Sequence, residues 1–65
     1  MNYSICFLDE GGRTRRTQFS PFHDDVAALA EARAELANTP IVEVWKDDLL
    51  LARLFRDQRQ SELIQ

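Results

Sequence analysis

At 65 residues the chain has the length of one small domain, and a second domain is excluded. Hydrophobic residues make up 45% of it and charged residues 29%, which is typical of a folded domain and not of a disordered tail. The net charge of −3 argues against a general polyanion-binding protein, and so small a core leaves little room for a deep catalytic pocket.

Cys6 is the one cysteine of the sequence, so no disulfide within the chain can stabilise the core. A reduced, cytoplasmic location fits this composition. The apolar run Tyr3–Leu8 is too short for a signal peptide, and no run approaches the roughly 20 apolar residues of a membrane helix. Because short chains without disulfides or metals commonly need a second subunit, we expect association.

The first part of the chain predicts a β-hairpin. Tyr3–Leu8 is rich in aromatic and aliphatic residues, which indicates a strand. Asp9–Gly12 supplies two glycines for a turn, and Arg13–Phe19 is expected to return as the second strand. Pro21 ends this hairpin, because proline cannot donate a hydrogen bond to a strand ladder.

Val26–Ala37 predicts a helix, because it is dense in Ala, Leu, Glu and Arg. Asp24 or Asp25 can cap its start, and Asn38–Pro40 suits its end. At about 100° per residue, one stripe of this helix is apolar and is expected to face the core: Val26, Leu29, Ala30, Leu36 and Ala37.

The second part of the chain adds another hairpin, with strands at Ile41–Trp45 and Leu49–Phe55 around a turn at Lys46–Asp48. The order ββαββ predicts an α+β fold in which one helix packs on one face of a four-stranded, mainly antiparallel sheet. A right-handed crossover favours the strand order 2-1-3-4. Residues 1–55 form this single domain, and residues 56–65 form a polar tail, for which a frayed helical turn and a flexible end both fit.

Strand alternation predicts that both faces of the sheet are apolar. In the second hairpin, a two-residue loop and a four-residue loop place the same residues of the two strands opposite each other. One face then holds three cross-strand pairs: Trp45 with Leu50, Glu43 with Ala52, and Ile41 with Leu54. The other face holds Val42, Val44, Leu51 and Phe55, with Leu49 and Arg53. Trp45 fits either the core or an interface, because the alternation of side chains along a strand does not say which face of the sheet the helix covers.

The first hairpin shows the same alternation. One face holds Tyr3, Ile5 and Phe7 with Thr14, Arg16 and Gln18, and the other holds Cys6, Leu8 and Phe19 with Arg13, Arg15 and Thr17. Since one helix covers only one face, something is expected to cover the second. The candidates are a second copy of the chain, a different protein, or residues 56–65.

No residues combine into a catalytic or metal site. Cys6 and His23 lie in different elements without a third orienting group, so a structural cysteine is the better interpretation. His23, Asp24 and Asp25 lack the spacing of a zinc or calcium site, and the carboxylates are better explained as helix caps. We expect a protein that is not an enzyme and has no catalytic residue, metal or cofactor.

Arg13–Arg16 is the one basic cluster. A basic β-ribbon can enter a DNA groove, which makes a small nucleic-acid-associated regulator the alternative function. The acidic total and the single lysine argue against it. A charged edge strand also resists unwanted strand pairing, and arginine can bind acidic residues of a partner.

Three stretches carry a resemblance that covers most of residues 3–54: Tyr3-x-Ile5-x-Phe7-Leu8-Asp9 with Gly12, Asp24-Asp25 before the helix, and Val42-Glu43-Val44-Trp45 followed by Leu51-Ala52-Arg53-Leu54. In these residues the chain resembles a group of small bacterial proteins of unknown function with a ββαββ plan. The resemblance implies the fold and supplies no activity, cofactor or site residue.

The sequence therefore predicts a non-enzymatic protein–protein interaction module, homodimeric through the apolar, helix-free face of the sheet. The partner is expected to be a second copy or another protein, without a membrane; nucleic acid is the alternative. The residues expected at the interface are Arg13, Arg15, Val42, Val44, Trp45, Leu51, Arg53 and Phe55.

Overall fold

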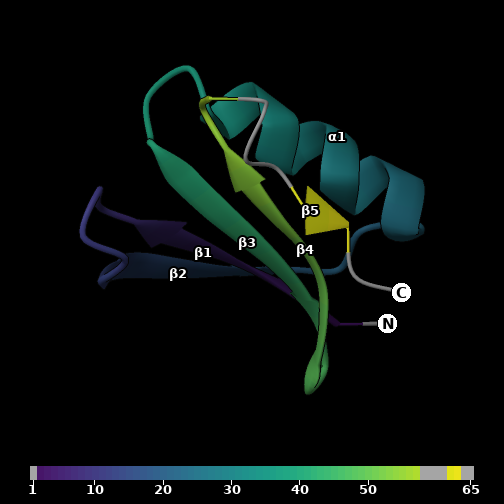
Figure 1. Cartoon of the computed structure of the whole chain (residues 1–65). Helices are drawn as coiled ribbons and strands as arrows, with labels where there is room; N and C mark the ends of the chain where they lie inside the picture. The colour runs from purple at the N-terminus through teal and green to yellow at the C-terminus, as the bar shows by residue number, and fades with distance from the viewer. Residues whose placement is uncertain (1, 58–61, 64–65) are drawn as a thin grey trace.

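The structure, a computed structural model, describes residues 2–57 and the backbone of Glu62–Leu63. Its elements in chain order are β1 (Tyr3–Leu8), β2 (Thr14–Ser20), α1 (Asp25–Glu35), β3 (Ile41–Lys46), β4 (Leu49–Phe55) and β5 (Glu62–Leu63). The strands form one antiparallel sheet in the order β2-β1-β3-β4-β5, and α1 packs on one face of it, against β3 and β4 (Figure 1). The predicted ββαββ fold and the strand order 2-1-3-4 are confirmed.

Part of the C-terminal tail joins the edge of the sheet. Glu62–Leu63 pairs with Ala52 and Arg53 of β4 as a fifth strand, so these two residues do not form the helical turn considered from the sequence. They lie beside β4 and extend the sheet. The sequence offered residues 56–65 as one candidate to cover the second face of the sheet. Of these, residues 58–61 and 64–65 lie outside the described residues.

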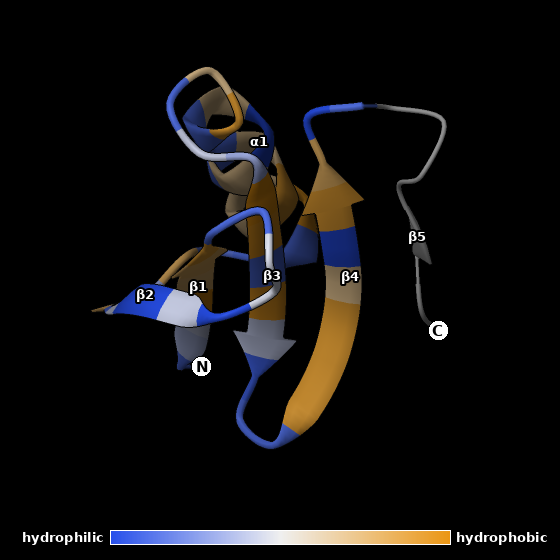
Figure 2. Ribbon diagram, turned by 60° about the vertical axis from the view of Figure 1, so that its left-hand side comes forward, coloured by the Kyte–Doolittle hydropathy of each residue, from blue (hydrophilic) through white to orange (hydrophobic). Residues whose placement is uncertain are grey.

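The core lies between α1 and the face of the sheet that β1 and β3 present to it. Ile5, Val42 and Val44 are completely buried there, and Figure 2 shows hydrophobic stretches along β3 and β4. The buried cluster consists of Tyr3, Ile5, Phe7, Ala28, Ala32, Val42, Val44, Leu51, Ala52 and Leu54. This membership decides which face the helix covers: it is the face of Tyr3, Ile5 and Phe7.

Of the two predicted cap candidates, Asp24 caps α1: its Oδ1 accepts a hydrogen bond from the Ala27 N–H at 2.9 Å. The helix meets the core through Ala28 and Ala32, which are completely buried one turn apart. Leu29 and Leu36 pack at the side of this contact, as predicted.

The rest of the predicted stripe is wrong, because Val26 is 73% exposed and both Ala30 and Ala37 are exposed. The small alanines Ala28 and Ala32, and not the larger valine, allow the helix to approach the sheet closely. The helix also ends at Glu35, before the expected Ala37, since residues 36–38 bond three positions back and not four.

A hydrogen-bonded cluster joins the start of α1 to the sheet. The Tyr3 hydroxyl donates to Asp25 Oδ1 at 2.5 Å, and Lys46 Nζ lies 3.5 Å from the same oxygen. The Tyr3 ring, 1% exposed, also contacts the Phe22 ring edge-on. The hydrogen bond to Asp25 and burial raise the pKa of Tyr3 to about 12, and the same bond lowers the pKa of Asp25 below its ordinary value.

This cluster makes stability depend on pH at both extremes. Tyr3 stabilises the fold fully below its unfolded pKa of 10.0, and we expect that contribution to be lost as the pH rises toward 12. Asp25 contributes above its unfolded pKa of 3.8, and that contribution is lost as the pH falls through its lowered folded pKa. Urea unfolding followed across the pH range measures both slopes.

Tyr3→Phe removes the hydroxyl, so it is expected to flatten the alkaline slope and to weaken the acidic one. Asp48→Asn, which changes an exposed carboxylate in the β3–β4 turn, serves as the control and should keep both slopes. An alkaline slope that is the same in Tyr3→Phe and in the natural protein would contradict the prediction, because Tyr3 is the one tyrosine of the chain.

Candidate interface on the helix-free sheet face

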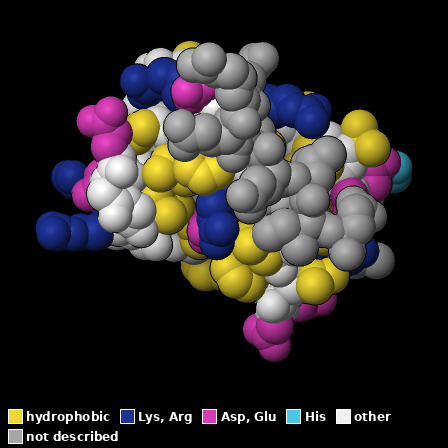
Figure 3. All heavy atoms as spheres, viewed as in Figure 1, with side chains coloured by type: hydrophobic (Ala, Val, Ile, Leu, Met, Phe, Trp, Pro, Cys, Tyr) yellow, Lys and Arg dark blue, Asp and Glu magenta, His cyan; other side chains and the backbone are white. Residues whose placement is uncertain are grey.

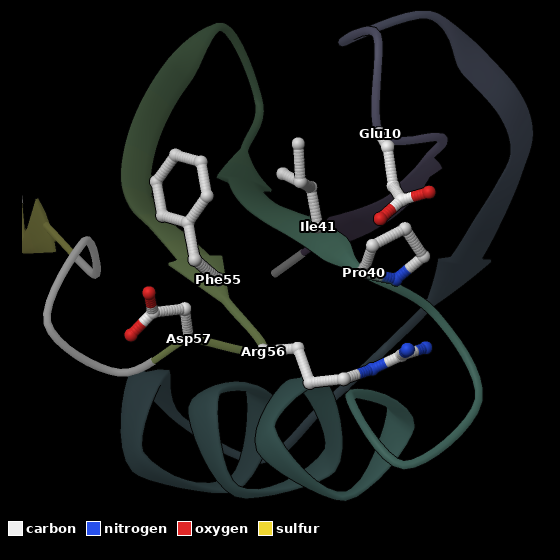
Figure 4. Close-up of a pocket in the computed structure, with 6 residues that line it drawn as sticks. All are labelled: Glu10, Pro40, Ile41, Phe55, Arg56 and Asp57. Carbon is white, nitrogen blue, oxygen red and sulfur yellow. The ribbon is translucent and has the colours of Figure 1, made fainter.

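The helix-free face of the sheet is formed by the residues that alternate with the core residues along β1, β3 and β4. In Figure 4 the side chains of Ile41 and Phe55 point away from α1, which places them on this face. Cross-strand pairing arranges the face in three rows: Leu8, Ile41 and Phe55; Cys6, Glu43 and Arg53; Ser4, Trp45 and Leu50.

A β-bulge decides which residues β4 contributes to this face. Trp45 pairs with Leu50, as predicted, but the register shifts between Val44 and Trp45, so that Val44 pairs with Ala52. Leu51 is therefore the extra residue of β4. One extra residue reverses the side to which every following residue points.

The bulge corrects the predicted pairing of β3 with β4. Glu43 pairs with Arg53, not with Ala52, and Ile41 pairs with Phe55, not with Leu54. Arg53 and Phe55 consequently share the helix-free face with Glu43 and Ile41. The first hairpin follows its predicted alternation from Ser20 as far as Arg16, and beyond Arg16 a register shift pairs Thr14 with Leu8.

Three of the eight predicted interface residues lie in the core, which corrects the prediction. Val42 and Val44 are completely buried beneath α1, so neither can contact a partner. Leu51 is 8% exposed and belongs to the same cluster. The sequence placed them outside because it could not say which face the helix covers.

The other five predicted residues remain accessible. Trp45, Arg53 and Phe55 are partly exposed on the helix-free face. Arg13 and Arg15 are exposed beyond them, at the end of the β1–β2 hairpin. Trp45, which the sequence left between core and interface, is therefore not part of the buried cluster.

A carboxylate lies at the centre of the helix-free face, and sequence reasoning missed its role. Glu43 is 9% exposed and accepts two hydrogen bonds, from Arg53 Nε at 2.9 Å and from Trp45 Nε1 at 3.1 Å. Such donors offset the cost of removing a carboxylate from water. The signal for this centre was a glutamate within an otherwise apolar strand, two residues before a tryptophan.

The row of Ile41 and Phe55 ends in a pocket of about 510 Å³ (Figure 4). The Arg56 backbone N–H donates to Pro40 O at 2.8 Å, and its side-chain Nε donates to Leu36 O at 3.1 Å, which fixes the end of β4 to the end of α1. The pocket is lined by Glu10, Pro40, Ile41, Phe55, Arg56 and Asp57. Its apolar wall is thus continuous with the helix-free face.

The remaining candidates have structural positions. Cys6 has a free thiol on the helix-free face, with Sγ 3.7 Å from Thr17 Oγ1. Among the described residues, no three His, Cys, Asp or Glu side chains gather where they could hold a metal ion. In the same part of the chain, no helix has the length and apolarity needed to cross a membrane.

Comparison of the chain with models of protein families, with curated proteins and with solved structures gives no match. The resemblance to small bacterial ββαββ proteins stays a prediction. The function proposed below therefore rests on the geometry of the helix-free face.

Proposed function

We propose that the protein is a non-enzymatic interaction module that forms a homodimer through its helix-free sheet face. The observation that carries this proposal is the partial exposure of Ile41 and Trp45 on a face that α1 does not cover. Figure 3 shows hydrophobic side chains gathered over β3 and β4, with a Lys or Arg side chain among them. An antiparallel sheet whose second face meets only water carries polar residues at such positions.

Burial of this face supplies the driving force. A large apolar side chain gains about 1.5–3 kcal/mol on complete burial, and partly exposed side chains retain part of that gain for association. Two of the three rows are mainly apolar, and they flank the polar row of Cys6, Glu43 and Arg53. The order apolar, charged, apolar reads the same after a half-turn, which suits contact between identical surfaces.

The charged row supports a second copy as the partner. Glu43 and Arg53 lie side by side, so a twofold axis near this row would bring each Arg53 toward Glu43 of the other copy. Opposite charges would then meet across the interface, and a shift of one row would place charges against apolar side chains. The pair thus favours one relative orientation of two identical faces.

The test is the mass of the protein in solution. We expect a dimer at micromolar concentrations by sedimentation equilibrium. Ile41→Glu places a charge in an apolar row and is expected to give a monomer. Leu49→Glu is the matched control: Leu49 is 58% exposed, but its partner Lys46 reaches Asp25 of α1, so it lies on the helix side of the sheet.

Two results would overturn the proposal. One is a natural protein that stays monomeric throughout the micromolar range. The other is a dimer that Ile41→Glu leaves intact, since the contact would then lie elsewhere. Circular dichroism of each variant shows that the fold survives the substitution.

A nucleic-acid-associated regulator is the alternative function, and it would use Arg13, Arg15 and Arg16. All three are exposed, as this function requires. Asp9 and Glu10 line the same end of the hairpin, where they would repel a phosphate backbone. The homodimer is therefore the function that the geometry supports best.

A further inference from the structure

Within the part of the chain that the structure describes, the outer strand β2 is a free edge of the sheet. Its one strand neighbour among the described residues is β1, whereas the opposite edge, β4, is paired with Glu62–Leu63. β2 is seven residues long, and all of it except Ser20 is exposed. An edge of this kind presents backbone N–H and C=O groups that can pair with another extended chain.

Positive charge is concentrated along this edge. Arg13, Arg15 and Arg16 are three of the eight Lys and Arg residues in a chain with a net charge of −3, and Figure 2 shows β2 as hydrophilic. Two ion pairs join one described residue to another, Lys46 with Asp25 and Arg53 with Glu43, and neither includes an arginine of β2 or of its turn. Their charge is available to a partner.

A β-bulge brings two of these arginines to one place. Phe7 pairs with Arg16 and Leu8 with Thr14, so Arg15 is the extra residue of β2. Arg15 and Arg16 consequently line the same pocket, of about 380 Å³, although they are consecutive in a strand. Asn38, Thr39 and Pro40, which precede β3, form part of the other wall.

The Arg16 guanidinium is held before any partner arrives. It lies over the Phe7 ring, with Cζ 4.2 Å from the ring centre, a cation–π contact. A guanidinium that is already positioned loses less conformational entropy when it binds a carboxylate. Paired arginines suit carboxylates, because each can donate two parallel hydrogen bonds.

We propose that β2 binds an acidic, extended segment of another protein, which adds to the sheet as a strand and places a carboxylate between Arg15 and Arg16. Two rival partners fit less well. A second copy would bring its own three arginines against this edge. A nucleic acid has no peptide backbone to pair with the N–H and C=O groups of β2. Asp9 and Glu10 line the same pocket and repel any anion, which disfavours the closely spaced phosphates of a nucleic acid more than a single carboxylate held by Arg15 and Arg16. Exposed Phe19 offers the incoming strand an apolar contact farther along β2.

The test uses a blocked synthetic peptide of alternating Glu and Val, and the same peptide with Gln in place of Glu. Binding is measured by fluorescence anisotropy at low and at physiological salt. We expect the Glu peptide to bind and the double variant Arg15→Gln/Arg16→Gln to weaken it about tenfold or more. Hydrogen exchange should show new protection of the β2 amides in the complex.

Arg33→Gln is the control for the loss of a positive charge elsewhere: it removes one exposed arginine from α1, away from β2, and should leave binding unchanged. Arg15→Glu should reverse the preference toward a peptide with Lys in place of Glu. Ile41→Glu, which tests the homodimer, should not affect the peptide, so the two proposals fail separately.

Any of four results would overturn the inference. They are equal binding of the Gln peptide, no loss of binding in the double arginine variant, no new protection of the β2 amides, and tighter binding of single-stranded oligothymidine than of the Glu peptide. The last result would assign the edge to nucleic acid.

Discussion

Ile5→Ala is expected to lower the free energy of unfolding by about 2–5 kcal/mol. Ile5 is completely buried on β1, between its cross-strand neighbours Gln18 and Val44, and belongs to the cluster beneath α1. Truncation removes apolar contacts and leaves a cavity that the neighbouring strands cannot close, because they are held in register on both sides of β1.

The effect is large for so short a chain. A stability of about 0.05–0.15 kcal/mol per residue gives about 3–10 kcal/mol for 65 residues, so this one substitution would remove much of it. Urea unfolding, measured at a concentration low enough to exclude association, gives the value. Ile5→Val, expected to cost about 0.5–1.5 kcal/mol, keeps the comparison measurable if Ile5→Ala does not fold.

Phe19→Ala is the control on the neighbouring strand. Phe19 is 78% exposed, and removal of its ring is expected to change the free energy of unfolding by less than about 0.5 kcal/mol. Equal losses for Ile5→Ala and Phe19→Ala would contradict the assignment of the core to the face beneath α1.

Local sequence signals were sufficient to predict the elements and their order. Tyr3–Leu8 and Ile41–Lys46 are rich in β-branched and aromatic residues. The turn between β1 and β2 follows from Asp9, whose carboxylate accepts the Gly11 and Arg13 N–H groups, and from Gly12, whose φ of 84° suits glycine. Each signal acts within a few residues, so a single sequence shows it.

The β-bulges could not be predicted in this way. The expected register of β3 and β4 followed from the Asp47–Asp48 turn and strict alternation, and it holds at the Trp45–Leu50 pair beside that turn. Beyond this pair the bulge shifts the register of β3 and β4 by one residue. The preference for Leu51 in the core arises from packing between distant segments, which alternation within one strand does not contain.

Because the bulges could not be predicted, the arrangement of the candidate site could not be predicted either. Glu43, Trp45 and Arg53 were each visible in the sequence, but the bulge is what places Arg53 opposite Glu43. The polar centre of the helix-free face therefore depends on a feature that no local pattern indicates. Likewise, Arg15 and Arg16 were expected on opposite faces, and a bulge in β2 brings both to one pocket.

The Glu43–Arg53 pair leads to the second large effect, on both stability and assembly. Arg53→Met is expected to cost about 1–3 kcal/mol, because it leaves the Glu43 carboxylate, with a side chain 12% exposed, bonded to Trp45 Nε1 alone. Glu43→Leu together with Arg53→Met is expected to cost less than Arg53→Met, since no charge is then left without a partner. Urea unfolding of the single and double variants, compared as a double-mutant cycle, measures the coupling.

The double variant should also show that the apolar rows determine the affinity of the dimer and that the Glu43–Arg53 pair determines the relative orientation of its two copies. Its helix-free face still buries the apolar rows of Ile41 and Trp45, so we expect association to persist in sedimentation. The pairing of Arg53 with Glu43 of the other copy is lost, however, and slipped arrangements become comparable in free energy. NMR amide spectra should change from one set of signals to broadened or multiple sets. Equal stability of Arg53→Met and the double variant would contradict this account, because a pair whose arginine side chain is 38% exposed would then act only as a solvated surface contact.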